Sequence, residues 1–378
     1  MKKIIFVSEM KIGSEKATST DIMTDNLIAG LKKTGYPIEI IAICEEPRYK
    51  ASIKHYYKDH VGGIHFVDSV FGKYRNGHTH LFRLLKNTVL KRKYAERIPT
   101  NIDYSEAILI AHAPSLESVF LCSQIVRENP QVKLYQYWSD PVALSGIIPE
   151  QYSYKRWPLR WVESQALKYA EKVIYGTKVL MDHQKNMFPK HAYKMDYIDV
   201  SYKANLESEV SIPVFSKNVF LYAGGYYSSV RNIVPLFNAV EKTNDVFLDV
   251  YGSGDVVPND LSKIRVKGRV SPQEISSKEL QYQNVICLMN TSCIQIPGKT
   301  FYGMNLPQNI LVILDGPHAS QIKTYLETYN RFFFCENTEE SIKAALEKMI
   351  SFDTILCKKN DKYSPEAIAM SLVEKNSN

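Results

Sequence analysis

The sequence lacks the short motifs that mark several large classes of nucleotide-dependent and hydrolytic enzymes. The loop after the first apolar segment, Lys3–Val7, has a single glycine, Gly13, where a GxGxxG dinucleotide fingerprint needs three. A GxxxxGKS/T phosphate loop, a GxSxG elbow and an HExxH helix are also absent from the sequence. NAD and flavin chemistry therefore loses most of its support, and P-loop phosphotransfer is excluded.

Long apolar runs and paired cysteines are scarce as well. No stretch approaches the ~20 consecutive apolar residues of a membrane span, and the apolar run at the N-terminus is too short for a signal peptide. The six cysteines include no CxxC pair, which predicts reduced, buried thiols in a cytoplasmic protein. Since no DxD-type metal pair is evident, we expect neither a metal nor another cofactor.

The length and the charge distribution predict two domains with different partners. A chain of 378 residues exceeds one ordinary domain, and its 45% hydrophobic and 23% charged residues are typical of a globular protein. Residues 1–205 carry 30 Lys and Arg against 21 Asp and Glu, whereas the rest of the chain is slightly acidic. A basic first half suits a phosphate-bearing substrate or an anionic surface.

Strand-like and helix-like segments alternate in both halves, which predicts an α/β fold with parallel sheets. We place one Rossmann-like domain at 1–204 and a second at 205–378, joined by the polar stretch 203–218. The last helix, about 365–376, is expected to pack back on the first domain. In such a pair of domains, ligands bind at the carboxyl ends of the strands, in the cleft across which the domains face each other.

The stretch FLYAGGYYSSVRNIVPLFNAV (220–240) is the most informative part of the second half. It predicts a strand, a turn at Gly224 and Gly225, and a helix that starts near Arg231. Glycines let a ligand approach the backbone, and a cation at a helix N-terminus suits a diphosphate. An ordinary strand-to-helix turn with a solvated arginine is the alternative interpretation.

Two further loops of the same predicted sheet add to this site. VYGSGD (250–255) predicts a tight turn at Gly252, and IPGKTFYGMNLP (296–307) places Lys299 at the start of a short helix. Arg231 and Lys299 would then bracket a diphosphate from two loops. Each residue alone is also compatible with a structural turn or a surface lysine.

These loops resemble those of the GT-B glycosyltransferases, in particular the large retaining family 4 that uses nucleotide sugars to build bacterial surface polysaccharides. The helix-then-strand passage RWVESQALKYAEKVIYGTK (160–178) is similar to that family too, and the likeness covers most of the chain. The resemblance implies that the second domain binds the nucleotide sugar and the first binds the acceptor. It also implies a retaining reaction.

The resemblance implies the donor-binding residues, with one departure. The family has a Glu three residues after the equivalent of Lys299, and this chain has Tyr302 there; the family's earlier acidic position falls at Ile294. We assign donor binding to the residues on these loops: Gly13, Gly224, Gly225, Arg231, Gly252, Lys299 and Tyr302.

Two residues of the first half are candidate catalytic groups. His112 follows the predicted strand 107–111, and Asp140 follows the strand 132–138. The resemblance implies that His112 lies near the donor sugar, where a neutral imidazole would bind a hydroxyl or help a proton transfer. A structural histidine and a loop-capping aspartate are the alternatives.

The sequence therefore predicts a cytoplasmic glycosyltransferase that moves a sugar from a nucleoside diphosphate sugar to a glycan or lipid-linked acceptor. The basic amphipathic segment 80–98 suggests peripheral attachment to an anionic membrane; a solvated helix packed on the core is the alternative. No motif supports nucleic-acid binding. A GT-B nucleotide-sugar epimerase and a catalytically silent GT-B protein that binds a glycan or a partner enzyme remain as alternative functions.

Overall fold

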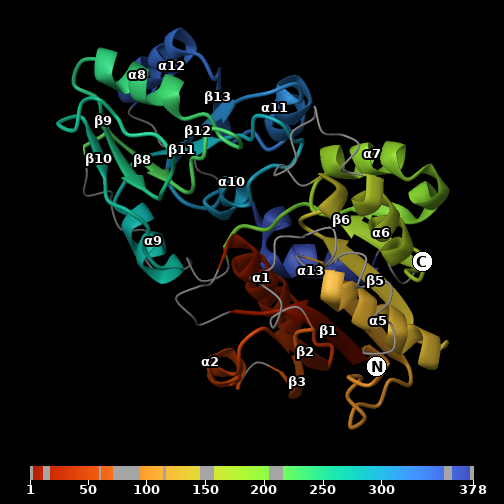
Figure 1. Ribbon diagram of the computed structural model, residues 1–378. Helices are drawn as coiled ribbons and strands as arrows, with labels where there is room; N and C mark the ends of the chain where they lie inside the picture. Colours follow the sequence, from red (N-terminus) through yellow and green to blue (C-terminus); the bar gives the residue numbers. More distant parts are fainter. Residues whose placement is uncertain are drawn as a thin grey trace. The chain divides into compact units, whose positions relative to one another are not determined.

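The computed structural model describes residues 3–11, 18–58, 61–70, 94–113, 116–144, 157–203, 216–352 and 360–374. The chain forms two compact units, Met1–Ser201 together with Lys362–Asn378, and Tyr202–Asp361. Each unit is built on one parallel β-sheet with helices between the strands, so the predicted α/β class is confirmed (Figure 1).

The sheet of the first unit has seven strands in the order β3-β2-β1-β4-β5-β6-β7. Its strands are β1 Lys3–Glu9, β2 Ile38–Cys44, β3 Gly63–Asp68, β4 Ala107–His112, β5 Lys133–Trp138, β6 Lys172–Tyr175 and β7 Met195–Tyr197. Its helices are α1 Ser19–Lys33, α2 Pro47–Tyr57, α5 Leu116–Glu128, α6 Trp157–Leu167, α7 Lys178–Met187 and α13 Pro365–Glu374, with 3₁₀ turns η2 Val142–Leu144, η4 Pro189–Lys194 and η6 Asp361–Tyr363.

The central strands of this sheet are apolar because helices cover both faces of a parallel sheet. Ile4 to Val7 in β1 are fully buried, and every residue of β4 is buried. Local signals fix where helices begin: the Asp21 carboxylate accepts hydrogen bonds from the backbone N–H and the hydroxyl of Thr18 at the start of α1. The α2 helix begins with Pro47, whose fixed φ suits a first helical residue.

The sheet of the second unit has six parallel strands in the order β10-β9-β8-β11-β12-β13. Its strands are β8 Val219–Ala223, β9 Phe247–Tyr251, β10 Ile264–Val266, β11 Asn284–Leu288, β12 Asn309–Leu314 and β13 Phe332–Glu336. Its helices are α8 Val234–Lys242, α9 Pro272–Glu279, α10 Lys299–Tyr302, α11 Ala319–Glu327 and α12 Glu339–Ser351. Because β8 lies next to both β9 and β11, the loops after these strands share one edge of the sheet.

The units are not continuous in sequence. The first boundary falls between Ser201 and Tyr202, close to the predicted 204/205, and the second falls just before Lys362. The α13 helix belongs to the first unit and packs on α1 so closely that a Cβ on Gly30 would overlap the carbonyl oxygen of Pro365. Within the residues described, no helix is long and apolar enough to cross a membrane.

Candidate functional site

Two glycine turns lie against each other at the carboxyl edge of the second sheet. The Gly224 N–H donates to the carbonyl of Tyr251 at 2.9 Å, and the Tyr226 N–H donates to the carbonyl of Ser253 at 3.1 Å. A Cβ at Gly252 would overlap the carbonyl oxygen of Gly224, whereas a Cβ at Gly225 would only make ordinary contacts. The close approach of the two backbones therefore requires glycine at 252 and does not require it at 225.

Lys299 reaches from α10 into this pair of turns. Its Nζ donates to the carbonyl oxygen of Ala223 at 2.5 Å and lies 4.0 Å from the centre of the Tyr222 ring. Gly224 makes room for the ammonium, because a Cβ there would come within 2.8 Å of Nζ and the φ of +151° disfavours any other residue. Burial lowers the pKa of Lys299 to about 8. The cation is thus held in a desolvated place that costs stability.

Arg231 lies beside the same turns. Its Nε donates to the side-chain oxygen of Asn290 at 3.0 Å, and its Nη1 donates to the carbonyl of Gly225 at 3.3 Å. The guanidinium charge further lowers the pKa of Lys299, so the two cations repel each other. Among the described residues, no carboxylate forms an ion pair with either cation. Two neighbouring cations with no carboxylate within ion-pair distance suit an anionic ligand.

The helix that carries Lys299 begins at this residue, as the sequence predicts, and it is one turn long. The N–H groups of Thr300 and Phe301 already donate to the carbonyls of Pro297 and Gly298 at 2.9 and 3.0 Å. These N–H groups are therefore not available to a phosphate, and the contribution of this loop is the ammonium itself. Tyr302 is only 7% exposed, so it can offer at most an edge to a ribose.

Glu279, which no sequence pattern marks as a site residue, lies at the end of α9 near Lys299 and Lys203. Burial raises the pKa of its carboxyl group, and the charges of the two lysines oppose that shift. Lys203 also donates to the hydroxyl of Ser276 in the same helix and, through its N–H, to the carbonyl of Tyr302 at 3.2 Å. Glu279 lies at the last residue of α9, far in sequence from the strand β10 that precedes this helix, so only the tertiary fold brings it to the site.

In the first unit, His112 lies inside the core at the end of β4. Its ring is fully buried, and Nδ1 lies 2.8 Å from the Thr24 hydroxyl and 3.3 Å from the Ser8 hydroxyl. Desolvation lowers the pKa of His112 to about 3, so the ring is neutral at pH 7. These contacts support the structural alternative that the sequence left open, and the catalytic role stays a prediction.

We expect His112→Ala to destabilise the protein by about 2–4 kcal/mol, because it removes a buried ring and leaves a cavity beside two hydroxyls. Urea denaturation at pH 7 measures this change. Thr24→Val, which removes only the hydroxyl partner, is the matched control and should cost about 1 kcal/mol. A His112→Ala protein that is as stable as wild type but has lost activity would instead support a catalytic role.

Of the two remaining candidates, Asp140 and Gly13, the structure describes only Asp140. Asp140 follows β5, and its Oδ2 accepts from the hydroxyls of Ser139 at 3.3 Å and Thr20 at 3.4 Å. Burial raises the pKa of this carboxyl group. Thr20 and Thr24 are one turn apart in α1, so Asp140 and His112 are held near the same helix. Gly13, like residues 80–93 of the basic segment, lies outside the described residues.

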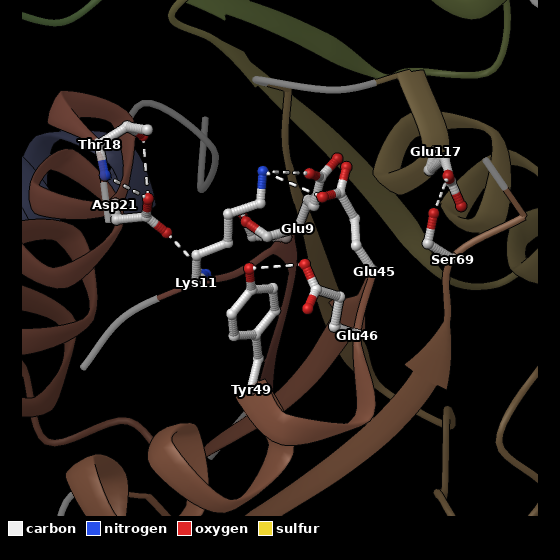
Figure 2. Close-up of polar contacts among 10 residues, drawn as sticks. Glu9, Lys11, Thr18, Asp21, Glu45, Glu46, Tyr49, Ser69 and Glu117 are labelled. Carbon is white, nitrogen blue, oxygen red and sulfur yellow. Dashed lines mark hydrogen bonds and ion pairs between the residues drawn. The ribbon is translucent and has the colours of Figure 1, made fainter. Parts of the chain in front are cut away.

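A second group of charged residues lies at the carboxyl edge of the first sheet, and Figure 2 shows it. The Lys11 Nζ lies 3.3 Å from carboxylate oxygens of both Glu9 and Glu45. Glu117, in the first turn of α5, accepts hydrogen bonds from the hydroxyl of Ser69 at 2.5 Å and the N–H of Val70 at 2.8 Å. Glu9 and Glu45 directly end or follow apolar strands, which is the signal that would have marked them as site candidates.

Burial raises the pKa of Glu9 to about 7; the Lys11 charge opposes this shift, while those of Glu45 and Glu117 add to it. A carboxyl group that titrates near neutral pH can both donate and accept a proton, as acid–base catalysis requires. Across the described residues, no group of three or more His, Cys, Asp or Glu has the arrangement of a metal site.

The raised pKa of Glu9 predicts a pH-dependent stability. Between pH about 4.5 and 7 the folded protein binds a proton that the unfolded chain releases, so this group makes stability fall as pH rises through that window. We expect Glu9→Gln to gain stability relative to wild type between pH 5 and 8, as measured by urea denaturation. Glu46→Gln, at the residue that precedes α2, is the control. A stability difference between Glu9→Gln and wild type that stays constant with pH would contradict the raised pKa of Glu9.

The chain matches no family model and no curated protein in sequence. Its fold is similar to that of sucrose-phosphate synthase from Thermosynechococcus elongatus, at 12% identity over 100% of this chain and 98% of that chain, with a TM-score of 0.59. The lipopolysaccharide outer core galactosyltransferase WaaB matches at 11% identity over 100% of both chains, with a TM-score of 0.54.

A third similar structure belongs to a different enzyme class. It is UDP-GlcNAc 2-epimerase from Neisseria meningitidis bound to UDP-GlcNAc, at 8% identity over 99% of both chains, with a TM-score of 0.55. Identities this low establish the fold alone. The chain therefore has the two-unit α/β fold that GT-B glycosyltransferases and UDP-GlcNAc 2-epimerases share.

Proposed function

We propose that the chain is a glycosyltransferase that moves a sugar from a nucleoside diphosphate sugar to a glycan or lipid-linked acceptor in cell-surface polysaccharide synthesis. The observation that carries this proposal is the pair of cations, Lys299 and Arg231, at the glycine turns of the second sheet. Their burial and mutual repulsion are relieved when a diphosphate lies between them.

In the proposed reaction, the bond between the sugar C1 and the diphosphate oxygen breaks, and a bond between C1 and an acceptor hydroxyl forms. The two cations stabilise the negative charge that develops on the departing diphosphate. The proton of the acceptor hydroxyl passes to the departing diphosphate, which leaves with it, so that atoms and charges balance.

A nucleotide-sugar epimerase is the second candidate. The whole-chain similarity to UDP-GlcNAc 2-epimerases favours it as much as the similarity to transferases favours the first. An epimerase would use the same diphosphate site, and it would need an acid–base group and no acceptor. The third alternative, a silent binding protein, would keep the fold without turnover.

Two measurements separate these functions. A thermal-shift screen with UDP, GDP, ADP and CMP tests the nucleotide site, and stabilisation by none of them would remove it. With the nucleotide found, its sugar conjugates are incubated with and without a glycan or lipid-linked acceptor. Acceptor-dependent release of nucleoside diphosphate supports the transferase, whereas acceptor-independent exchange of a sugar-ring proton with D₂O, followed by NMR, supports the epimerase. Binding without either reaction supports the silent protein.

A further inference from the structure

The α6 helix carries two tryptophans on its solvent side. Trp157 is 70% exposed and Trp161, one turn later, is 41% exposed, whereas the third tryptophan of the chain, Trp138, is buried. Tryptophan is highly buried on average, and exposed aromatic side chains that form a patch mark an interaction surface. The other face of α6 is apolar and packs into the first unit through the buried residues Leu159 and Val162.

The same solvent face is cationic. Arg160 and Lys168 share the face with the two tryptophans, because residues 157, 160, 161, 164 and 168 follow the helical repeat. The only acidic residue of α6, Glu163, is fully buried and accepts a hydrogen bond from the N–H of Ala143 at 2.8 Å. Every exposed residue of α6 is therefore an aromatic or a cation.

The short helix η4 extends this surface. It lies beside α6, since the ring Nε2 of His191 is 3.3 Å from the Ser164 hydroxyl and Lys194 donates to the carbonyls of Lys168 and Ala170. Its exposed residues include Lys190 and Tyr193, the latter 85% exposed. We define the Trp157 surface as Trp157, Arg160, Trp161, Lys168, Lys190 and Tyr193.

We propose that the Trp157 surface docks the protein on an anionic phospholipid membrane. Tryptophan and tyrosine prefer the headgroup region of a bilayer, and lysine and arginine are attracted to acidic lipids. The cations and the lack of an exposed carboxylate on α6 and η4 give the charge complementarity that an acidic lipid surface requires. The proposal does not depend on which reaction the protein catalyses, nor on the basic segment 80–98.

The tryptophans themselves report on the contact. Purified full-length protein is mixed with vesicles of phosphatidylcholine alone or with 30% phosphatidylglycerol, and flotation and Trp emission are measured. We expect flotation and a blue shift with the acidic vesicles only, and quenching of the emission by brominated lipid. Trp138, recorded in the Trp157→Ser, Trp161→Ser variant, serves as the buried reference that vesicles do not change.

Matched variants locate the surface. Because each cation near an acidic membrane contributes about fivefold to binding, Arg160→Gln, Lys168→Gln, Lys190→Gln should weaken vesicle binding about 100-fold. The control Lys242→Gln, Lys323→Gln, Lys343→Gln removes the same charge from exposed positions of the second unit and should bind like wild type. Trp157→Ser, Trp161→Ser should weaken binding at least tenfold without changing the melting temperature.

Four results would overturn the proposal. Wild type that does not float with acidic vesicles excludes the membrane, and flotation with unchanged Trp emission moves the contact to another part of the chain. A dimer in sedimentation velocity that the double Trp variant abolishes, without vesicle binding, would assign the surface to a second copy of the chain. Equal loss of vesicle binding in the triple variant of the Trp157 surface and in the triple control variant of the second unit would show that only the net charge of the protein matters.

Discussion

Replacing Lys299 by methionine should abolish most nucleotide binding while making the unliganded protein more stable. The methionine keeps an unbranched side chain of similar length and removes the desolvated charge that lies over the Tyr222 ring beside Arg231. Loss of one charge-assisted contact to a diphosphate costs about 1.5–3 kcal/mol, which is a tenfold to hundredfold loss of affinity. Calorimetric titration of the nucleoside diphosphate identified by thermal shift measures the affinity, and urea denaturation measures the stability.

The decisive feature is that nucleotide affinity should fall while the stability of the unliganded protein rises. Replacing a lysine with a purely structural role would lower both. The control is Lys278→Met, at a lysine of α9 whose Nζ lies 5.5 Å from the centre of the Tyr251 ring. This control should change the nucleotide affinity by no more than about threefold and the free energy of unfolding by no more than about 0.5 kcal/mol. Unchanged affinity in Lys299→Met and in Arg231→Ala would remove the diphosphate site.

The pH dependence of wild-type binding follows from the same lysine. Its pKa is about 8 without ligand, and a bound diphosphate raises it again because the anion favours the charged form. Binding therefore takes up protons near pH 8, and the affinity should fall as pH rises from 8 to 9.5 by up to tenfold per pH unit. Lys299→Met should lose this dependence, whereas a wild-type affinity that is flat across the range would contradict the lowered pKa.

Replacing Gly252 by alanine should disrupt the paired turns, whereas the same change at Gly225 should be tolerated. A Cβ at 252 meets the backbone carbonyl of Gly224, which cannot rotate away, so the turns after β8 and β9 must separate. We expect Gly252→Ala to lose about 3 kcal/mol of stability and at least tenfold in nucleotide affinity, since Lys299 is held by the same turns.

Gly225→Ala is the matched control, because its Cβ would lie 3.6 Å from the Tyr227 ring and 3.8 Å from the Ser253 carbonyl, which are ordinary contacts. Urea denaturation and nucleotide titration of both variants provide the comparison. If Gly252→Ala is as stable and binds as well as Gly225→Ala, the turns are not rigidly paired, and the glycines do not shape the site.

Several elements were predictable because their signals are local. Buried parallel strands are continuous apolar runs, and β4 and β5 lie within one residue of the predicted strands 107–111 and 132–138. The elements that the sequence did not reveal are polar or short: α2 is rich in Lys and Tyr, and β3 is largely half-buried. The α9 helix has few apolar positions, although Ser271 and Pro272 mark its start.

The residues of the candidate donor site were predictable from the sequence, but their contacts with one another were not. Glycine turns after strands and a cation near each turn are visible in the sequence, because parallel strands end at one edge of a sheet. The sequence alone does not show that the ammonium of Lys299 lies over the Tyr222 ring, nor that Gly252 and Gly225 have unequal roles. Both depend on how closely two backbones and one side chain approach in three dimensions.

The sequence by itself therefore determined the α/β class, the alternation of strands and helices in both halves of the chain, and the loops that could hold a ligand. These features depend on hydrophobic periodicity and turn residues, which act over a few residues. Only the tertiary structure decided that His112 is buried between Ser8 and Thr24, that Glu9 shares Lys11 with Glu45, and that two tryptophans of α6 face solvent. Burial and electrostatic environment arise from residues far apart in the chain, so no local pattern encodes them.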